Sequence, residues 1–137
     1  PIGIPEVVRE GTDLTLVSYG STFNVCAKAC DLLAGMGISV ELIDARTLLP
    51  FDRTHRCVES LRKTNRLLVV DEDVPGGASA YLLREILEVQ GGYRHLDATP
   101  STLTAKAHRP AYGSDGDYFS KPSLEDIVEK VVGMVRE

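Results

Sequence analysis

Apolar runs alternate with stretches of helical spacing along most of this chain. Nearly unbroken apolar runs lie within 14–19, 39–45 and 66–73, which is typical of strands that are buried on both faces of a sheet. Elsewhere, apolar residues recur every three or four positions, as over 20–36 and 78–90. Strands that alternate with helices predict an α/β fold with a mostly parallel sheet.

Capping and turn residues indicate where several of these elements begin. Gly20 and Ser21 open the first helix, and Asp52 is a suitable N-cap for a second helix that carries Cys57 and Leu61. The segment 6–10 is a short candidate for a further strand. We therefore expect the order strand, strand, helix, strand, helix, strand and helix up to residue 90.

The carboxyl-terminal part of the chain predicts three further segments. A final strand fits 101–107, and 108–121 is rich in turn-forming residues, which predicts an ordered surface loop. Ser123 followed by Asp126 is a capping signal for a closing helix. The buried stripe of this helix is predicted to be Ile127, Val128, Val131, Val132 and Val135.

Length and composition predict a single domain over 1–137. Of the 137 residues, 43% are hydrophobic, which is enough for one real core. Fifteen Lys and Arg stand against 20 Asp and Glu with no clustered basic run, so a nucleic-acid partner is not expected. No apolar run approaches the roughly 20 residues that cross a bilayer, so a membrane is not expected either. We expect a protein of the cytoplasm, or of the mitochondrial matrix in a eukaryote.

The three cysteines favour a structural role over a disulfide or metal site. Cys26 and Cys30 lie one helical turn apart and could form half of a metal site, but neither His nor further Cys follows to complete four ligands. An odd number of cysteines in a chain of this size argues against a disulfide framework. We predict reduced thiols that pack as small buried hydrophobic side chains.

The sequence contains none of the common short motifs of catalytic or phosphate-binding sites. It contains no nucleophile elbow, phosphate-binding loop, zinc-binding helix or dinucleotide-binding fingerprint. The string SDGD at 114–117 lacks the later acidic positions of a calcium loop, and we predict a turn. His55, His95 and His108 stand apart and are predicted surface or capping residues. We therefore predict no catalytic, cofactor-binding or metal-binding residue in this chain.

The carboxyl ends of the parallel strands are the expected place for a ligand or partner. Amides after Gly20 could hold an anion, whereas Asp44, Asp71, Glu72 and Asp73 would repel a phosphate there. Arg46 would form an ion pair that fastens its loop, or else face a partner surface or an anionic substrate group. The candidate anion-site or interface residues at this edge are Gly20, Ser21, Asp44, Arg46, Glu72, Gly76 and Gly77.

Four strings in order carry a resemblance to a known family. They are GTDLTLVSYG, IDARTLLPFD, NRLLVVDED with two following glycines, and PSLEDIVEKV. Together they resemble the carboxyl-terminal domain of the transketolase superfamily, most closely that of the beta subunit or beta half of the 2-oxo acid dehydrogenase first component. The most specific pattern is formed by Asp44, Arg46, Thr47, Leu48, Pro50 and Asp52.

This resemblance implies a three-layer α/β/α fold with a five-stranded mixed sheet whose first strand is antiparallel. It also implies residues 1–5 as the end of an interdomain linker, 6–107 as sheet and crossover helices, 108–122 as a surface loop and 123–136 as the closing helix. The implied whole enzyme uses thiamine diphosphate and Mg²⁺ to decarboxylate a 2-oxo acid and passes the acyl group to lipoamide. The metal-binding motif and pyrimidine domain are missing, so this chain is expected to be a fragment that is inactive alone.

The resemblance also implies partners for the loop at 43–52. We expect it to brace the sheet edge against other domains or subunits of the enzyme or a dimer mate, with Asp44 and Arg46 as polar anchors. Pro50 and Phe51 would be its apolar wedge. The subunit-binding domain of the acyltransferase component is a further expected partner.

Two alternatives remain open from the sequence. A transketolase or a deoxyxylulose-phosphate synthase could carry the same terminal domain. A stand-alone flavodoxin-like binding module is the non-enzyme alternative, which the acidic strand ends disfavour. The sequence leaves open which 2-oxo acid is used.

Overall fold

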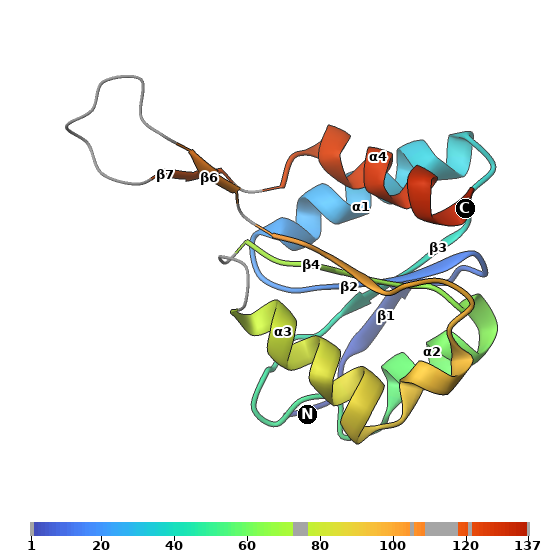
Figure 1. Cartoon of the computed structure of the whole chain (residues 1–137), viewed down its shortest axis with the longest axis vertical. Coiled ribbons are helices and arrows are strands. Elements are labelled where there is room, and N and C mark those ends of the chain that lie inside the picture. Colours follow the sequence, from blue (N-terminus) through green and yellow to red (C-terminus); the bar gives the residue numbers. More distant parts are fainter. Residues whose placement is uncertain (1, 73–76, 105, 109–117, 121, 137) are drawn as a thin grey trace.

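A five-stranded sheet lies between two layers of helices (Figure 1). The computed structural model describes residues 2–72, 77–104, 106–108, 118–120 and 122–136. The strands lie in the order β1-β3-β2-β4-β5. They are β1 (Glu6–Arg9), β2 (Leu14–Ser18), β3 (Val40–Asp44), β4 (Leu67–Val70) and β5 (Ser101–Leu103).

Strand β1 runs antiparallel to β3, and the remaining neighbours are parallel. One face of the sheet is covered by α1 (Thr22–Gly35) and α4 (Leu124–Val135). The other carries α2 (Arg56–Thr64) and α3 (Ala78–Leu83). The predicted three-layer α/β/α fold with a mixed, mostly parallel sheet is therefore confirmed.

Strand β2 lies at the centre of the sheet and is buried on both faces. Leu16 pairs with Leu42 on one side and with Leu68 on the other. Side chains alternate between the faces of a strand, so Leu16 packs under α1 and α4 while Val17 packs against α2 and α3. A continuous apolar run in the sequence thus supplies both cores at once.

The helix starts follow the predicted capping residues. Helix α1 begins at Thr22 with Ser21 at the N-cap position, and Ser123 forms a reciprocal capping box with Asp126 at the start of α4. The Asp52 carboxylate accepts hydrogen bonds from the Arg56 and Cys57 N–H groups, both at 2.8 Å. Asp52 therefore caps α2 as predicted, although the N-cap position itself is three residues later.

The predicted helix over 78–90 is present, but its second half has a different geometry. After α3, the chain continues as a π-helix, Arg84–Val89, and then as a 3₁₀ helix, Gly92–His95. Val89 belongs to the apolar pattern of this segment, but it is 57% exposed and does not face the core. Hydrogen bonds in a π-helix span five residues, so apolar spacing for 3.6 residues per turn no longer identifies the buried face.

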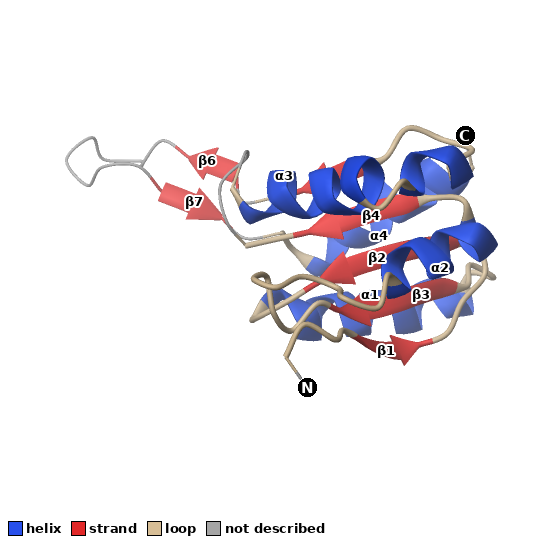
Figure 2. Ribbon diagram, turned by 90° about the horizontal axis from the view of Figure 1, so that it is seen from below, coloured by secondary structure: helices blue, strands red, loops and turns tan. Residues whose placement is uncertain are grey.

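Two predictions for the segment after residue 100 need correction. The strand predicted at 101–107 is divided between β5 and β6 (Lys106–His108), which pairs antiparallel with β7 (Tyr118–Ser120). The predicted surface loop at 108–121 therefore contains strand at both described ends. This two-stranded sheet projects away from the three layers (Figure 2). Residues 109–117 and 121, including SDGD, lie outside the described residues.

The cysteines have the predicted structural role. All three are free and buried. Burial raises the pKa of the Cys26 thiol to about 12 and that of Cys30 to about 11, and raises the pKa of Cys57 well above its ordinary value. These thiols are therefore protonated packing groups in the folded protein.

Glu41 is a buried acid on β3 whose charge is balanced within the fold. Its Oε1 atom accepts a hydrogen bond from Lys63 Nζ at 2.5 Å and from the Gly11 N–H at 3.1 Å. Burial alone would raise the pKa of Glu41, but hydrogen bonds from Lys63, Ser60 and Gly11, with the Lys63 charge, lower it below its ordinary value. The folded state therefore favours the ionised carboxylate.

We expect Glu41→Gln to remove part of the acid sensitivity of this fold. Because the folded pKa is lowered, the ionised group stabilises the fold above its ordinary pKa, and this stabilisation is lost as the pH falls through the lowered pKa. Urea unfolding between pH 7 and pH 3 should show a smaller decline in unfolding free energy for Glu41→Gln than for the wild type. Asp31→Asn, at a 75% exposed side chain, is the control. Parallel curves for wild type and Glu41→Gln would refute this account.

Candidate functional site

The carboxyl ends of the three central strands bring most of the predicted site residues to one edge of the sheet. The register pairs Ser18 of β2 with Asp44 of β3 on one side and with Val70 of β4 on the other. Gly20 and Ser21 follow β2, and Glu72 follows β4. Gly77 is the N-cap residue of α3, and Asp73 and Gly76 lie outside the described residues.

Asp71 is the central carboxylate of this edge, and it is fully buried. One oxygen accepts a hydrogen bond from the Tyr19 hydroxyl at 2.7 Å, and the other accepts from the Ser79 N–H at 3.1 Å in the first turn of α3. The Asp71 N–H donates to the Leu103 carbonyl at 2.9 Å. Asp71 thus ties β2, β5 and α3 to the end of β4, a role that the sequence analysis missed.

Glu72 and the start of α1 lie in direct contact. The Ser21 hydroxyl donates to Glu72 Oε2, and a Cβ added to Gly20 would lie 3.4 Å from Glu72 Oε1. Gly20 has a φ of +66°, which is a conformation that glycine adopts readily. The Glu72 carboxylate therefore already lies at the helix start where the sequence suggested that an anion could bind.

Arg46 fastens its loop to the edge strand of the sheet. Its guanidinium forms an ion pair with Glu6 of β1, and its N–H donates to Asp44 Oδ1 at 3.0 Å. Arg46 has a φ of +61°, so the chain turns sharply directly after β3. The geometry agrees with the fastening role that the sequence allowed for Arg46.

The same loop holds the amino-terminal segment of the chain. The Gly3 N–H donates to Thr47 Oγ1 at 2.9 Å, and the Gly3 carbonyl accepts from the Arg53 N–H at 2.7 Å. Phe51 is 5% exposed and packs in the core under α2, while Pro50 is exposed after a cis peptide bond. The wedge toward a neighbour therefore cannot include Phe51, whereas Leu49, 80% exposed, is open to contact.

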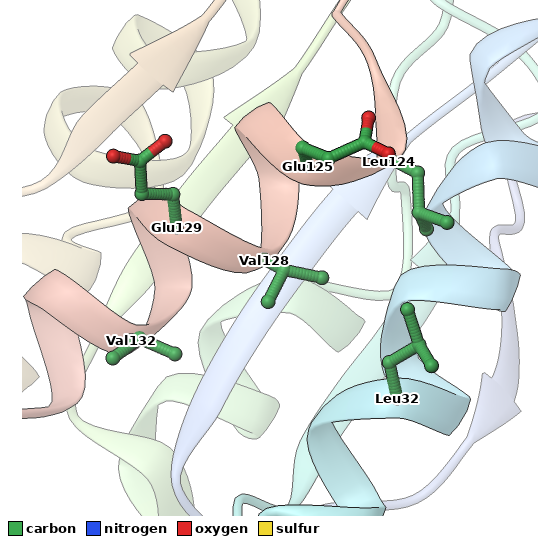
Figure 3. Close-up of a pocket in the computed structure, with 6 residues that line it drawn as sticks. All are labelled: Leu32, Leu124, Glu125, Val128, Glu129 and Val132. Carbon is green, nitrogen blue, oxygen red and sulfur yellow. The ribbon is translucent and has the colours of Figure 1, made fainter.

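A second surface is an apolar groove between α1 and α4, with a volume of about 400 Å³ (Figure 3). Leu32 of α1 and Leu124 of α4 point toward one another, and Leu32 is 52% exposed. The Glu129 carboxylate lies on the side of α4 away from α1, whereas the Glu125 carboxylate lies beside Leu124. Part of the apolar surface of α4 is therefore not covered by α1 and lines the groove. The groove is lined by Leu32, Leu124, Glu125, Val128, Glu129 and Val132.

Within the described ranges, no group of three or more His, Cys, Asp or Glu side chains is placed to hold a metal ion. Among the same residues, none of the helices has both the length and the apolar character to cross a lipid bilayer. The described polar side chains at the sheet edge make hydrogen bonds to helix starts and neighbouring strands. The site is thus suited to bracing the fold and presenting surfaces to a neighbour.

The chain is similar in sequence to beta subunits of 2-oxo acid dehydrogenases. The chain is 35% identical over 129 residues to the mitochondrial pyruvate dehydrogenase E1 component subunit beta of Pisum sativum, covering 93% of this chain and 35% of that protein. It is 44% identical over 90 residues to the mitochondrial 2-oxoisovalerate dehydrogenase subunit beta 2 of Arabidopsis thaliana, covering 64% of this chain and 25% of that protein. This chain therefore spans about a third or less of these relatives.

A solved structure has the same fold. An inactive beta4 tetramer of a split-gene transketolase superposes with a TM-score of 0.72 at 21% identity, covering 98% of this chain and 43% of that chain. Residues 3–121 match the family described as the transketolase C-terminal domain. The match includes the loop after β3 and the edge formed by Asp71 and Glu72. The chain therefore belongs to the transketolase C-terminal domain family, as its four sequence strings predicted.

Proposed function

We propose that this chain is the C-terminal assembly domain of a thiamine-diphosphate-dependent 2-oxo acid dehydrogenase. The whole enzyme would decarboxylate a 2-oxo acid and transfer the acyl group to lipoamide, and this chain would be inactive alone. The named beta subunits of pyruvate and 2-oxoisovalerate dehydrogenases among its relatives support this reaction class. Both relatives are named as mitochondrial, which supports a location in the mitochondrial matrix of a eukaryote, and we propose the cytoplasm for a bacterium.

The observation that carries the assembly role is the internal use of the carboxylates at the sheet edge. Open parallel sheets bind ligands beyond the carboxyl ends of their strands. Here Asp71 bonds to Tyr19 and to the start of α3, and Glu72 bonds to Ser21. These groups stabilise the local arrangement of helices and strands, which suits a scaffold better than a reaction centre.

The described residues do not fit the cofactor of the implied enzyme. Mg²⁺ with a diphosphate needs oxygen ligands that converge on one point, and the described part of the chain has no group of three or more His, Cys, Asp or Glu side chains placed to hold a metal ion. The Glu72 carboxylate at the start of α1 would also repel a diphosphate. We propose that thiamine diphosphate and Mg²⁺ bind to other parts of the enzyme.

The exposed surfaces indicate what kind of neighbour this domain would meet. The groove between α1 and α4 has apolar walls and acidic side chains on α4, so it fits a partner surface with an apolar ridge and basic flanks. Such a surface could belong to another domain or subunit of the enzyme, to a dimer mate, or to the subunit-binding domain of the acyltransferase component. Leu49 and Arg46 give the loop after β3 a second exposed contact.

We expect Arg46→Ala to weaken assembly of the intact enzyme severalfold without changing its chemistry. Assembly would be measured by analytical ultracentrifugation, and turnover with pyruvate and with a branched-chain 2-oxo acid. The kcat per assembled enzyme and the KM should remain those of the wild type, because the proposal places Arg46 at a contact between subunits or domains and not at a reacting group. The unfolding free energy of the chain should fall by less than about 1 kcal/mol, since the ion pair with Glu6 is exposed.

Glu6→Gln is the matched control because it removes the same ion pair but leaves the guanidinium free. If Arg46 faces a neighbour, Arg46→Ala should weaken assembly more than Glu6→Gln does. A fall in kcat at unchanged assembly would overturn the assembly role. Absence of turnover with either 2-oxo acid in the wild-type enzyme would overturn the proposed reaction.

A further inference from the structure

A basic pocket away from the sheet edge described above is lined by residues of α2, the π-helix and the 3₁₀ helix. Figure 1 shows α2 on the face of the sheet opposite α1 and α4. The volume of the pocket is about 490 Å³, which is within the range of small-molecule sites. Helix α2 ends at Thr64, shortly before β4 begins at Leu67, so this pocket is near the amino end of β4. Arg62, Arg94 and His95 line it together with Tyr93 and Glu88.

The two arginines and the histidine of this pocket lack carboxylate partners within the described part of the chain. There, Arg62, Arg94 and His95 have no carboxylate oxygen within 4.0 Å, and the same is true of single cations elsewhere, such as Arg53 and Arg56. Glu88 is the acidic residue of the lining, and it pairs with Arg84 at 3.8 Å. A chain with a formal net charge of −5 thus places two arginines without carboxylate partners beside His95 at one concave site.

Arg94 is held in place by its neighbours rather than by an ion pair. Its guanidinium lies over the Tyr93 ring, 5.8 Å from the ring centroid. The Nη2, Nε and Cζ atoms of Arg94 lie 3.7 to 3.9 Å from the position that a Gly91 Cβ would take. Gly91 has a φ of +75°, so the turn depends on glycine there, and the guanidinium packs over this turn at van der Waals distance. An arginine that is oriented in advance loses less freedom when it binds an anion.

We propose that this pocket binds a phosphate-bearing small molecule. Arg62 and Arg94 supply planar donor groups that match phosphate oxygens in a bidentate geometry, and His95 adds a ring N–H donor. Tyr93, 62% exposed, provides a partly apolar wall for an organic group attached to the phosphate. The proposal does not depend on the assembly role, because the pocket uses neither the sheet edge nor the groove between α1 and α4.

The test is a titration of the 137-residue chain with pyrophosphate and, separately, with ADP at 150 mM NaCl. Two-dimensional ¹H–¹⁵N NMR should show shifts centred on Gly91, Gly92 and Arg94, and calorimetry should give a Kd for each probe. Arg62→Ala and Arg94→Ala should each weaken binding about tenfold or more, because a hydrogen bond to a charged group is lost. Tighter binding of ADP would assign an organic phosphate, and equal binding would assign the phosphoryl group alone.

Arg56→Ala is the control, since Arg56 is an exposed arginine at the other end of α2. It should bind both probes as the wild type does. Arg94→Lys keeps the charge but not the planar donor group, and should bind more weakly than the wild type. The proposal is overturned if the shifts do not centre on the pocket, or if Arg56→Ala weakens binding as much as Arg94→Ala.

Discussion

Gly11→Ala should destabilise this fold by about 3 kcal/mol or more, because the added methyl group has no room. A Cβ at Gly11 would overlap the carbonyl carbon of Val40 and the Glu41 nitrogen, and would lie 2.5 Å from the Val40 oxygen. These are backbone atoms of β3, so they cannot move without disturbing the sheet. The Gly11 N–H also donates to Glu41, and a shift of the turn would weaken that bond. Urea unfolding followed by circular dichroism measures the loss.

Gly133→Ala is the matched control for this substitution. Gly133 lies in α4, and a Cβ there would meet nothing within 4 Å. Alanine in a helix interior is favoured over glycine by about 1 kcal/mol, so Gly133→Ala should stabilise the protein slightly. The steric explanation would be wrong if Gly11→Ala unfolded at the same urea concentration as the wild type.

Asp52→Ala should lower the free energy of unfolding by about 3 kcal/mol, because it removes a buried side chain that caps α2. Asp52 is fully buried and accepts the N–H groups of Arg56 and Cys57. Loss of a cap costs about 0.5–2 kcal/mol, and a buried donor left without a partner costs about 1–3 kcal/mol. Asp52 also has a φ of +41°, which alanine adopts less readily. Urea unfolding gives the total loss.

Reactivity of Cys57 gives a local readout of the same substitution. Cys57 is fully buried beside the cap, and loosening the first turn of α2 should speed its modification by a thiol reagent. Cys26 and Cys30, on the other face of the sheet, should react as slowly as in the wild type. Asp52→Asn keeps one acceptor oxygen and should show a smaller loss. If Asp52→Ala were as stable as the wild type, Asp52 would not act as the cap of α2.

Local patterns predicted the elements correctly where the physical cause was itself local. The Ser123–Asp126 capping box depends on residues three positions apart, and the apolar run of β2 depends on neighbouring side chains. The π-helix over Arg84–Val89 escaped prediction because its apolar spacing resembles that of an ordinary helix. The pairing of β6 with β7 was not predicted, because the pattern of apolar and polar residues can indicate a strand but does not show which strand it pairs with.

The sequence by itself determined the α/β class, the order of strands and helices through α3, the capping residues and the family, since each depends on short spacings or on a string of adjacent residues. Only the tertiary structure decided how the candidate residues are used. The bonds from Tyr19 to Asp71 and from Arg46 to Glu6 join residues 52 and 40 positions apart. The basic pocket likewise combines Arg62 with Arg94. Such distant contacts arise when strands and helices pack, and no local pattern of the chain encodes them.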